Sequence, residues 1–116
     1  MLDAGTMPPV PALDRAVREG RALADACEAA LSAHDRAGPG LARPGRLDRA
    51  ALFGRAERCL AARSRVARLL PDPGGVGPAA LAASDPTCLR LACLWRRLRE
   101  AGMRSRDRSM PWEGED

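Results

Sequence analysis

PALDRAVREGRALADACEAALSAHDRA, residues 11–37, carries the clearest structural signal in the chain. At about 100° per residue, its apolar side chains gather on one arc and its charged side chains on the other. The apolar arc contains Leu13, Ala16, Val17, Gly20, Leu23, Ala24, Cys27, Ala30, Leu31 and His34. Pro11 suits the first helical turn, and Gly38 and Pro39 end the pattern. The spacing therefore predicts an amphipathic helix over 11–37.

A second amphipathic helix is predicted over 49–70, ended by Pro71. Asp48 is a suitable N-cap, and Leu47 and Leu52 occupy the two positions of a hydrophobic staple. The apolar stripe of this helix contains Leu52, Ala56, Cys59, Leu60, Val66, Ala67 and Leu70. We expect four arginines to point away from the stripe: Arg55, Arg58, Arg65 and Arg68. Arg63 breaks the pattern because it falls near the middle of the stripe.

A third helix is predicted from Asp85 and Pro86, an N-cap followed by a first-turn proline, to near Gly102. Its inner face contains Cys88, Leu91, Leu94, Trp95, Leu98 and Ala101. Leu89 and Cys93 lie on the opposite side and form a small outward apolar spot. Between the second and third helices, PDPGGVGPAALAAS, residues 71–84, predicts a loop with one helical turn at 79–83.

These segments predict one all-α domain over 11–102, with a flexible N-terminus at 1–10 and a flexible tail at 103–116. Neither strand alternation nor a repeat of fixed period is visible. Short connections favour an antiparallel three-helix bundle, and the alternative is a long helical hairpin that dimerises. A core of mainly Ala and Leu buries little apolar area per residue. We therefore expect a protein partner or self-association to add stability.

All 19 basic residues are arginine, and Ile, Asn, Gln and Tyr are absent along with Lys. This composition is typical of a gene with very high GC content, so arginine richness alone does not indicate phosphate binding. The charge is nevertheless unevenly distributed. Residues 46–70 and residues 87–109 each carry a net charge of +5, whereas residues 1–45 carry −1.

The sequence predicts no enzyme, no metal and no cofactor. Cys88 and Cys93, the closest pair of cysteines, project about 140° apart on a helix, which does not suit a zinc chelate. Cys27 and His34 share a face but lie two turns apart, about 10 Å, too far for a catalytic hydrogen bond. We expect His34 to be partly buried near a helix end, where the macrodipole favours a cation. The glycines of the 71–84 loop follow no strand, so no phosphate-binding loop is indicated.

Two groups of residues are candidates for binding. For a partner protein they are Arg63, Leu89, Cys93 and Trp112. Arg63 needs a carboxylate, from Asp25, Glu28 or a partner, unless its side chain extends along the stripe to water. Trp112 is an aromatic anchor in the predicted tail. For DNA or RNA, the candidates are Arg55, Arg58, Arg65, Arg68, Arg96 and Arg97; a solvated basic face without a ligand is the alternative interpretation.

The sequence therefore predicts a non-enzymatic helical module for protein–protein interaction, either an adaptor, a regulator or a small subunit of a larger assembly. The alternative is a DNA- or RNA-binding factor that acts through its arginines. The start of the chain lacks the features of a signal peptide, and no apolar run is long enough to span a bilayer. Four irregularly spaced cysteines favour reduced thiols. We expect a cytoplasmic, intracellular protein with no membrane partner and no small-molecule substrate.

Overall fold

The computed structural model describes residues 10–38 and 44–105, which form four helices. They are α1 (Val10–Ala37), α2 (Arg49–Leu69), α3 (Pro78–Ala82) and α4 (Pro86–Arg104). The all-α prediction is confirmed, since these described residues contain no strand. Within the same ranges, no helix is both long and apolar enough to cross a bilayer. Residues 1–9, 39–43 and 106–116, and with them Trp112, lie outside the described residues.

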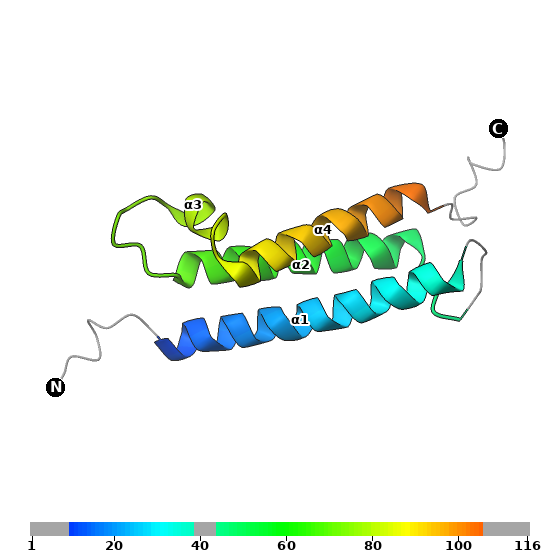
Figure 1. Cartoon of the computed structure of the whole chain (residues 1–116), viewed down its shortest axis with the longest axis horizontal. Coiled ribbons are helices and arrows are strands. Elements are labelled where there is room, and N and C mark those ends of the chain that lie inside the picture. The colour runs from blue at the N-terminus through cyan, green and yellow to red at the C-terminus, as the bar shows by residue number, and fades with distance from the viewer. Residues whose placement is uncertain (1–9, 39–43, 106–116) are drawn as a thin grey trace.

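The three long helices lie side by side, and each runs in the opposite direction to the one before it (Figure 1). The most extensive contact is between α2 and α4, whereas α1 packs less extensively on both. The short helix α3 folds back onto α2, at the end of the molecule where α1 begins (Figure 1). The helix α1 is therefore the least tightly held of the three long helices.

Both predicted N-caps are confirmed. The Asp48 carboxylate accepts a hydrogen bond from the Ala51 N–H at 2.7 Å, and the Asp85 carboxylate accepts one from the Cys88 N–H at 2.9 Å. Amide groups in the first turn of a helix have no partner within the helix, so these two carboxylates stabilise the starts of α2 and α4.

The predicted helical turn in the 71–84 connection is confirmed as α3. The Asp72 carboxylate organises the loop before it, since its two oxygens accept hydrogen bonds from the N–H groups of Val76 and Gly77, each at 2.9 Å. Gly75 and Gly77 have φ values of 64° and 96°, a backbone region that favours glycine. This turn places Ala82 of α3 in the core.

Two clusters of buried side chains form the core. The larger one contains Ala24, Cys27, Leu31, Leu52, Ala56, Cys59, Leu91, Leu94, Leu98 and Ala101. The smaller one contains Ala16, Val66, Ala67, Ala82 and Cys88. Apart from the residue from α3, every member was predicted to face inward from one of the long helices. The 3.6-residue periodicity therefore located the core correctly.

Helix α4 continues past its predicted end, because α2 holds its last turn. Gly102 lies against the ring of Phe53, and a Cβ atom on Gly102 would approach the nearest ring carbon to 3.1 Å. The Arg49 guanidinium donates hydrogen bonds to the carbonyls of Gly102 and Ser105 at 3.2 and 2.8 Å. Residues 103–105 thus belong to the folded domain rather than to the predicted tail.

One of the four arginines predicted to point away from the core does not. Arg58, Arg65 and Arg68 are exposed as expected. Arg55 is half-buried, and its Nε is buried without a hydrogen-bond partner among the described residues. The prediction considered the residues of this helix alone. It therefore left out the neighbouring helix that covers the edge of the apolar stripe, where Arg55 lies.

Candidate interaction surface between helices α1 and α2

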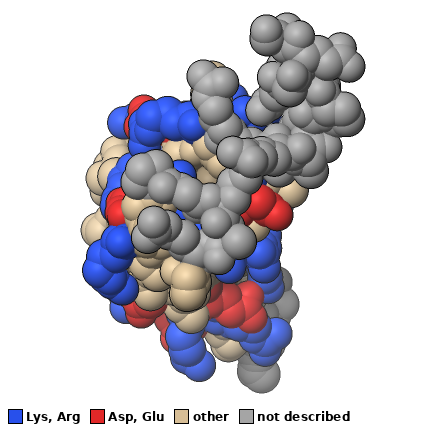
Figure 2. Space-filling model, turned by 90° about the vertical axis from the view of Figure 1, so that its right-hand side faces the viewer, with Lys and Arg blue, Asp and Glu red and all other residues tan. Residues whose placement is uncertain are grey.

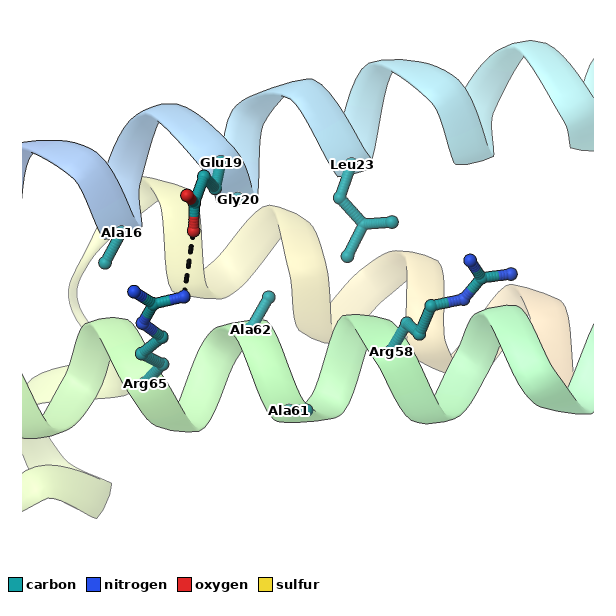
Figure 3. Close-up of a pocket in the computed structure, with 8 residues that line it drawn as sticks. All are labelled: Ala16, Glu19, Gly20, Leu23, Arg58, Ala61, Ala62 and Arg65. Carbon is teal, nitrogen blue, oxygen red and sulfur yellow. Dashed lines mark hydrogen bonds and ion pairs between the residues drawn. The ribbon is translucent and has the colours of Figure 1, made fainter.

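A groove of about 290 Å³ lies between α1 and α2, and α4 passes behind it in the view of Figure 3. Its lining consists of Ala16, Glu19, Gly20 and Leu23 from α1, with Arg58, Ala61, Ala62 and Arg65 from α2. Leu23 points from α1 toward α2, and Ala62 points from α2 toward α1 (Figure 3). Half of the lining residues are Ala or Gly, and these small residues leave an open hollow between the two helices.

The rim of the groove carries an excess of positive charge. Arg65 and Glu19 form an ion pair across the groove at 2.8 Å, with both side chains about half exposed. Arg58 is exposed and forms no ion pair with a described residue. An exposed ion pair contributes little to stability, so the Glu19–Arg65 contact is available for exchange with a partner.

The groove results from small residues at positions where helices normally interdigitate larger side chains. On α1, a Cβ atom at Gly20 would lie 3.3 Å from side-chain carbons of Leu91 and Thr87, so glycine allows α4 to pack closely there. On α2, the methyl group of Ala62 points toward α1 but is too short to fill the space between the two helices (Figure 3). The helix α4 therefore packs closely on α1 at Gly20, while small side chains leave a hollow between α1 and α2 at the same level.

Arg63 lies at a second cavity, of about 330 Å³, between α2 and α3. Its Nε is buried without a partner among the described residues, and its carbonyl accepts a hydrogen bond from the Cys88 thiol at 3.7 Å. Within the described chain, Arg63 pairs with neither Asp25 nor Glu28, and both of these carboxylates bind Arg90. The half-buried state of Arg63 agrees with the alternative, in which its stem lies along the stripe.

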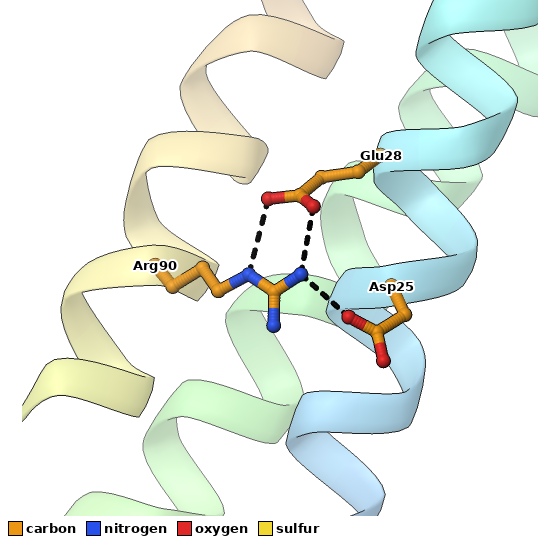
Figure 4. Close-up of polar contacts among 3 residues, drawn as sticks. All are labelled: Asp25, Glu28 and Arg90. Carbon is orange, nitrogen blue, oxygen red and sulfur yellow. Dashed lines mark hydrogen bonds and ion pairs between the residues drawn. The ribbon is translucent and has the colours of Figure 1, made fainter.

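Arg90 cross-links α4 to α1 (Figure 4). Its Nε donates to one oxygen of Glu28 at 3.0 Å, and one Nη donates to the other oxygen at 2.7 Å and to Asp25 at 2.6 Å. The hydrogen bonds from Arg90 lower the pKa of Glu28, and those to Glu28 and Asp25 raise the pKa of Arg90. Charged cross-links therefore occupy the α1–α4 side of the domain, opposite the open groove.

The outward apolar spot predicted on α4 is present. Leu89 is 49% exposed and Cys93 is exposed, as are Arg96 and Arg97 on the same helix. None of these four residues lines the α1–α2 groove. The predicted partner-binding residues Arg63, Leu89 and Cys93 thus lie outside the lining of the α1–α2 groove.

The arginines predicted to contact nucleic acid do not form one patch. Arg58 and Arg65 border the groove, whereas Arg97 lies on the α4 side of α1, near enough to Glu28 to lower its pKa. Arginine surface also predominates over acidic surface at the end of the molecule where α1 and α4 end and α2 begins (Figure 2).

His34 is buried, with 3% of its surface exposed. Its Nδ1 accepts a hydrogen bond from the Leu47 N–H at 3.0 Å, which places the proton of the neutral ring on Nε2. Burial lowers the pKa of His34 below its ordinary value of 6.5, and the charge of Arg46 lowers it further. The expectation that a cation is favoured here is wrong, because desolvation outweighs the helix dipole.

The four cysteines differ in their surroundings. Cys27 and Cys59 are fully buried with their Sγ atoms 3.6 Å apart, and Cys88 is also buried, whereas Cys93 is exposed. Burial raises the pKa of Cys59 to about 12 and that of Cys88 to about 11. Among the residues that the structure describes, no group of three or more His, Cys, Asp or Glu side chains could hold a metal ion.

Comparison of the chain with protein-family models, with curated proteins and with solved structures returns no match. Function is therefore inferred from the geometry and charge of the groove itself.

The apolar residues of the groove were missed as site residues at the level of sequence. Two of them, Ala61 and Ala62, stand between Arg58 and Arg65 in the chain. Small residues at the edge of an apolar stripe, flanked by arginines, are the signal that could have located the groove.

Proposed function

We propose that this chain is a non-enzymatic protein-interaction module whose α1–α2 groove binds an acidic amphipathic helix of a partner protein. It would serve as an adaptor, a regulator or a small subunit of a larger assembly. The observation that carries the proposal is a groove of small residues with an excess of arginine at its rim. In this proposal the long helices act as an antiparallel three-helix bundle, and the partner helix adds a fourth.

The shape of the groove suits a helix. Its walls are antiparallel helices, and its lining runs over residues 16–23 of α1 and 58–65 of α2, about two turns of each helix. Small side chains allow an incoming helix to approach within the usual interaxial distance of about 8–10 Å. Leu or Met side chains of that helix would fill the space that Ala16, Ala61 and Ala62 leave open. Insertion of an amphipathic helix into an apolar groove is a common mode of recognition.

The charge of the rim favours an acidic helix over a basic one. Of the two arginines at the rim, Glu19 neutralises only Arg65. Arg58 has no carboxylate partner in the described part of the chain. A Glu or Asp beside the apolar face of the partner would pair with Arg58 and share Arg65. Such rim contacts mainly set specificity and association rate, while apolar contact in the groove supplies most of the affinity.

Fluorescence polarisation with labelled synthetic helices would test this proposal. One helix carries Leu and Ala on a single face with Glu on both sides, and a second has Lys in place of each Glu. We expect saturable binding of the acidic helix and binding of the basic helix at least about tenfold weaker, a difference of about 1.4 kcal/mol or more. Equal binding of the two helices, or binding of neither, would contradict the proposal.

A matched pair of variants tests where the helix binds. Ala61→Glu adds bulk and negative charge to the groove lining, and we expect it to weaken binding of the acidic helix at least about tenfold. Ala50→Glu adds the same side chain at an exposed position of α2 that does not line the groove, and it should leave affinity unchanged. If both variants bind as the unmodified protein does, the groove is not the site.

A second copy of the chain is the other possible occupant of the groove. Sedimentation equilibrium of the unmodified protein and of Ala61→Glu distinguishes the two. We expect a monomer in both cases. A dimer that Ala61→Glu dissociates would assign the groove to self-association and overturn the acidic-helix proposal.

Binding of DNA or RNA through arginine is the alternative function. It predicts binding of labelled duplex DNA or single-stranded RNA that weakens steeply with salt. This binding should be lost when Arg55, Arg58, Arg65 and Arg68 are all replaced by serine. Indifference to all four changes would remove this alternative.

A further inference from the structure

We propose that Cys27 and Cys59 form a redox-modification site, at which a peroxide converts the two thiols into a disulfide joining α1 to α2. Their Sγ atoms are already in contact at 3.6 Å, with the thiol of Cys59 donating to the sulfur of Cys27. Both side chains are fully buried, so solvent does not separate them. The two residues are 32 positions apart in the chain, so the bond would close a long loop.

The surroundings of the pair favour closure of this bond over any other. A disulfide needs an S–S distance of about 2.0 Å, so the two sulfurs must approach by about 1.6 Å. Ala24 and Ala56, one turn before each cysteine, are small and lie in the same buried cluster, which allows the helices to move together. The Cys88 thiol belongs to the other cluster and is hydrogen-bonded to the Arg63 carbonyl.

The chemistry requires one equivalent of a peroxide. The thiolate of one cysteine attacks a peroxide oxygen, the O–O bond breaks, and a sulfenic acid forms while the leaving oxygen is released as water or an alcohol. The sulfur of the second cysteine then attacks the sulfenic sulfur. The S–S bond forms, the S–O bond breaks and a water leaves. The two sulfurs together lose two electrons, and the peroxide gains them.

Burial makes this reaction slow, so the buried pair should react after the exposed Cys93. It holds Cys59 in its protonated form, with a pKa raised to about 12, and a thiolate is the reactive species. Reaction therefore requires transient separation of α1, the long helix with the less extensive packing. Cys93 is exposed and should react first with any thiol reagent.

The proposed bond would also affect the groove, a consequence that rests on the proposed function. Cys27 and Cys59 belong to the two helices that form the walls of the groove. A covalent bond between these walls would fix their spacing and so change the affinity for a partner helix. The disulfide itself does not depend on that consequence.

Peptide mapping of the oxidised full-length chain tests the proposal. The Cys93→Ser variant prevents cross-linking between molecules; it is treated with hydrogen peroxide, alkylated and digested with trypsin without reduction. Cleavage after arginine places the two thiols on separate peptides, residues 22–36 and 59–63. We expect these two peptides to be linked, with the loss of two hydrogen atoms. A link to Cys88 instead, or oxidation to sulfinic acid without a link, would overturn the proposal.

Two further measurements separate native geometry from chance pairing. Oxidation of the same variant in urea should give mixed pairings, and Cys27→Ser with Cys93→Ser should give no link in the folded protein.

The folded, oxidised form should melt higher than the reduced form, by on the order of 10 °C for a loop of this length. A lower melting temperature would show that the native geometry does not accommodate the bond. Failure of the acidic helix to bind would refute the proposed function and leave the disulfide result intact.

Discussion

Replacement of Gly54 by alanine should stabilise this protein, whereas the same replacement at Gly20 should not. Gly54 is exposed within α2, and a Cβ atom there would meet nothing within 4 Å. Alanine in a helix interior is favoured over glycine by about 0.8–1.0 kcal/mol, so Gly54→Ala should gain about that amount.

At Gly20 the same gain is opposed by crowding. Its Cβ would lie 3.3 Å from the nearest carbons of Leu91 and Thr87, both buried on α4. Crowding in a packed core costs about 1–3 kcal/mol, so the net effect of Gly20→Ala should lie between neutral and about 2 kcal/mol destabilising.

Thermal denaturation followed by circular dichroism would measure both variants beside the unmodified protein. We expect the melting temperature of Gly54→Ala to rise by about 4–8 °C and that of Gly20→Ala to stay level or fall. Equal stabilisation by the two substitutions would refute the close packing of α4 against α1 at Gly20. The pair is matched in chemistry, so helix propensity cannot account for a difference.

Three further predictions concern particular contacts. Burial lowers the pKa of His34 in the folded protein, so the unfolded chain binds a proton at His34 more readily than the folded chain does. The contribution of His34 to stability should therefore be complete above about pH 6.5 and should decline as the pH falls toward and through the folded-state pKa. Urea titrations between pH 7.5 and pH 5.5 should show this decline, and His34→Gln should abolish it. Leu94→Ala should destabilise the fold by about 2–5 kcal/mol because Leu94 is buried, whereas Leu89→Ala, at an exposed position, should change stability by about 0.5 kcal/mol or less. Arg90→Met should lower the melting temperature at low ionic strength, and the deficit should shrink in high salt because the lost contacts with α1 are partly exposed ion pairs; a deficit independent of salt would contradict that assignment.

The sequence predicts well those features that depend on one helix at a time. The caps at Asp48 and Asp85 and the inward faces of the long helices follow from local spacing, and each agrees with the structure. The helix ends differ where another helix intervenes. At α4, hydrogen bonds from Arg49 hold the last turn, and nothing in the sequence around Gly102 indicates them.

Features that depend on two helices at once could not be predicted in this way. Arg90 binds carboxylates more than 60 positions earlier in the chain, and the contact of Cys27 with Cys59 depends on the register between α1 and α2. His34 was expected to favour a positive charge because only its own helix was considered. The return of the chain to Leu47 buries its ring and reverses that preference. The groove could not be predicted from the sequence either, because its width depends on the separation of two helices.

The most direct test is a nuclear magnetic resonance titration of the isotope-labelled chain with the unlabelled acidic helix. We predict that the largest shift changes fall on Ala16, Leu23, Ala61 and Ala62, and that the resonances of Leu89 and Cys93 on the outer face of α4 stay in place. Changes confined to α4, or none at peptide concentrations that saturate the polarisation signal, would contradict binding in the α1–α2 groove.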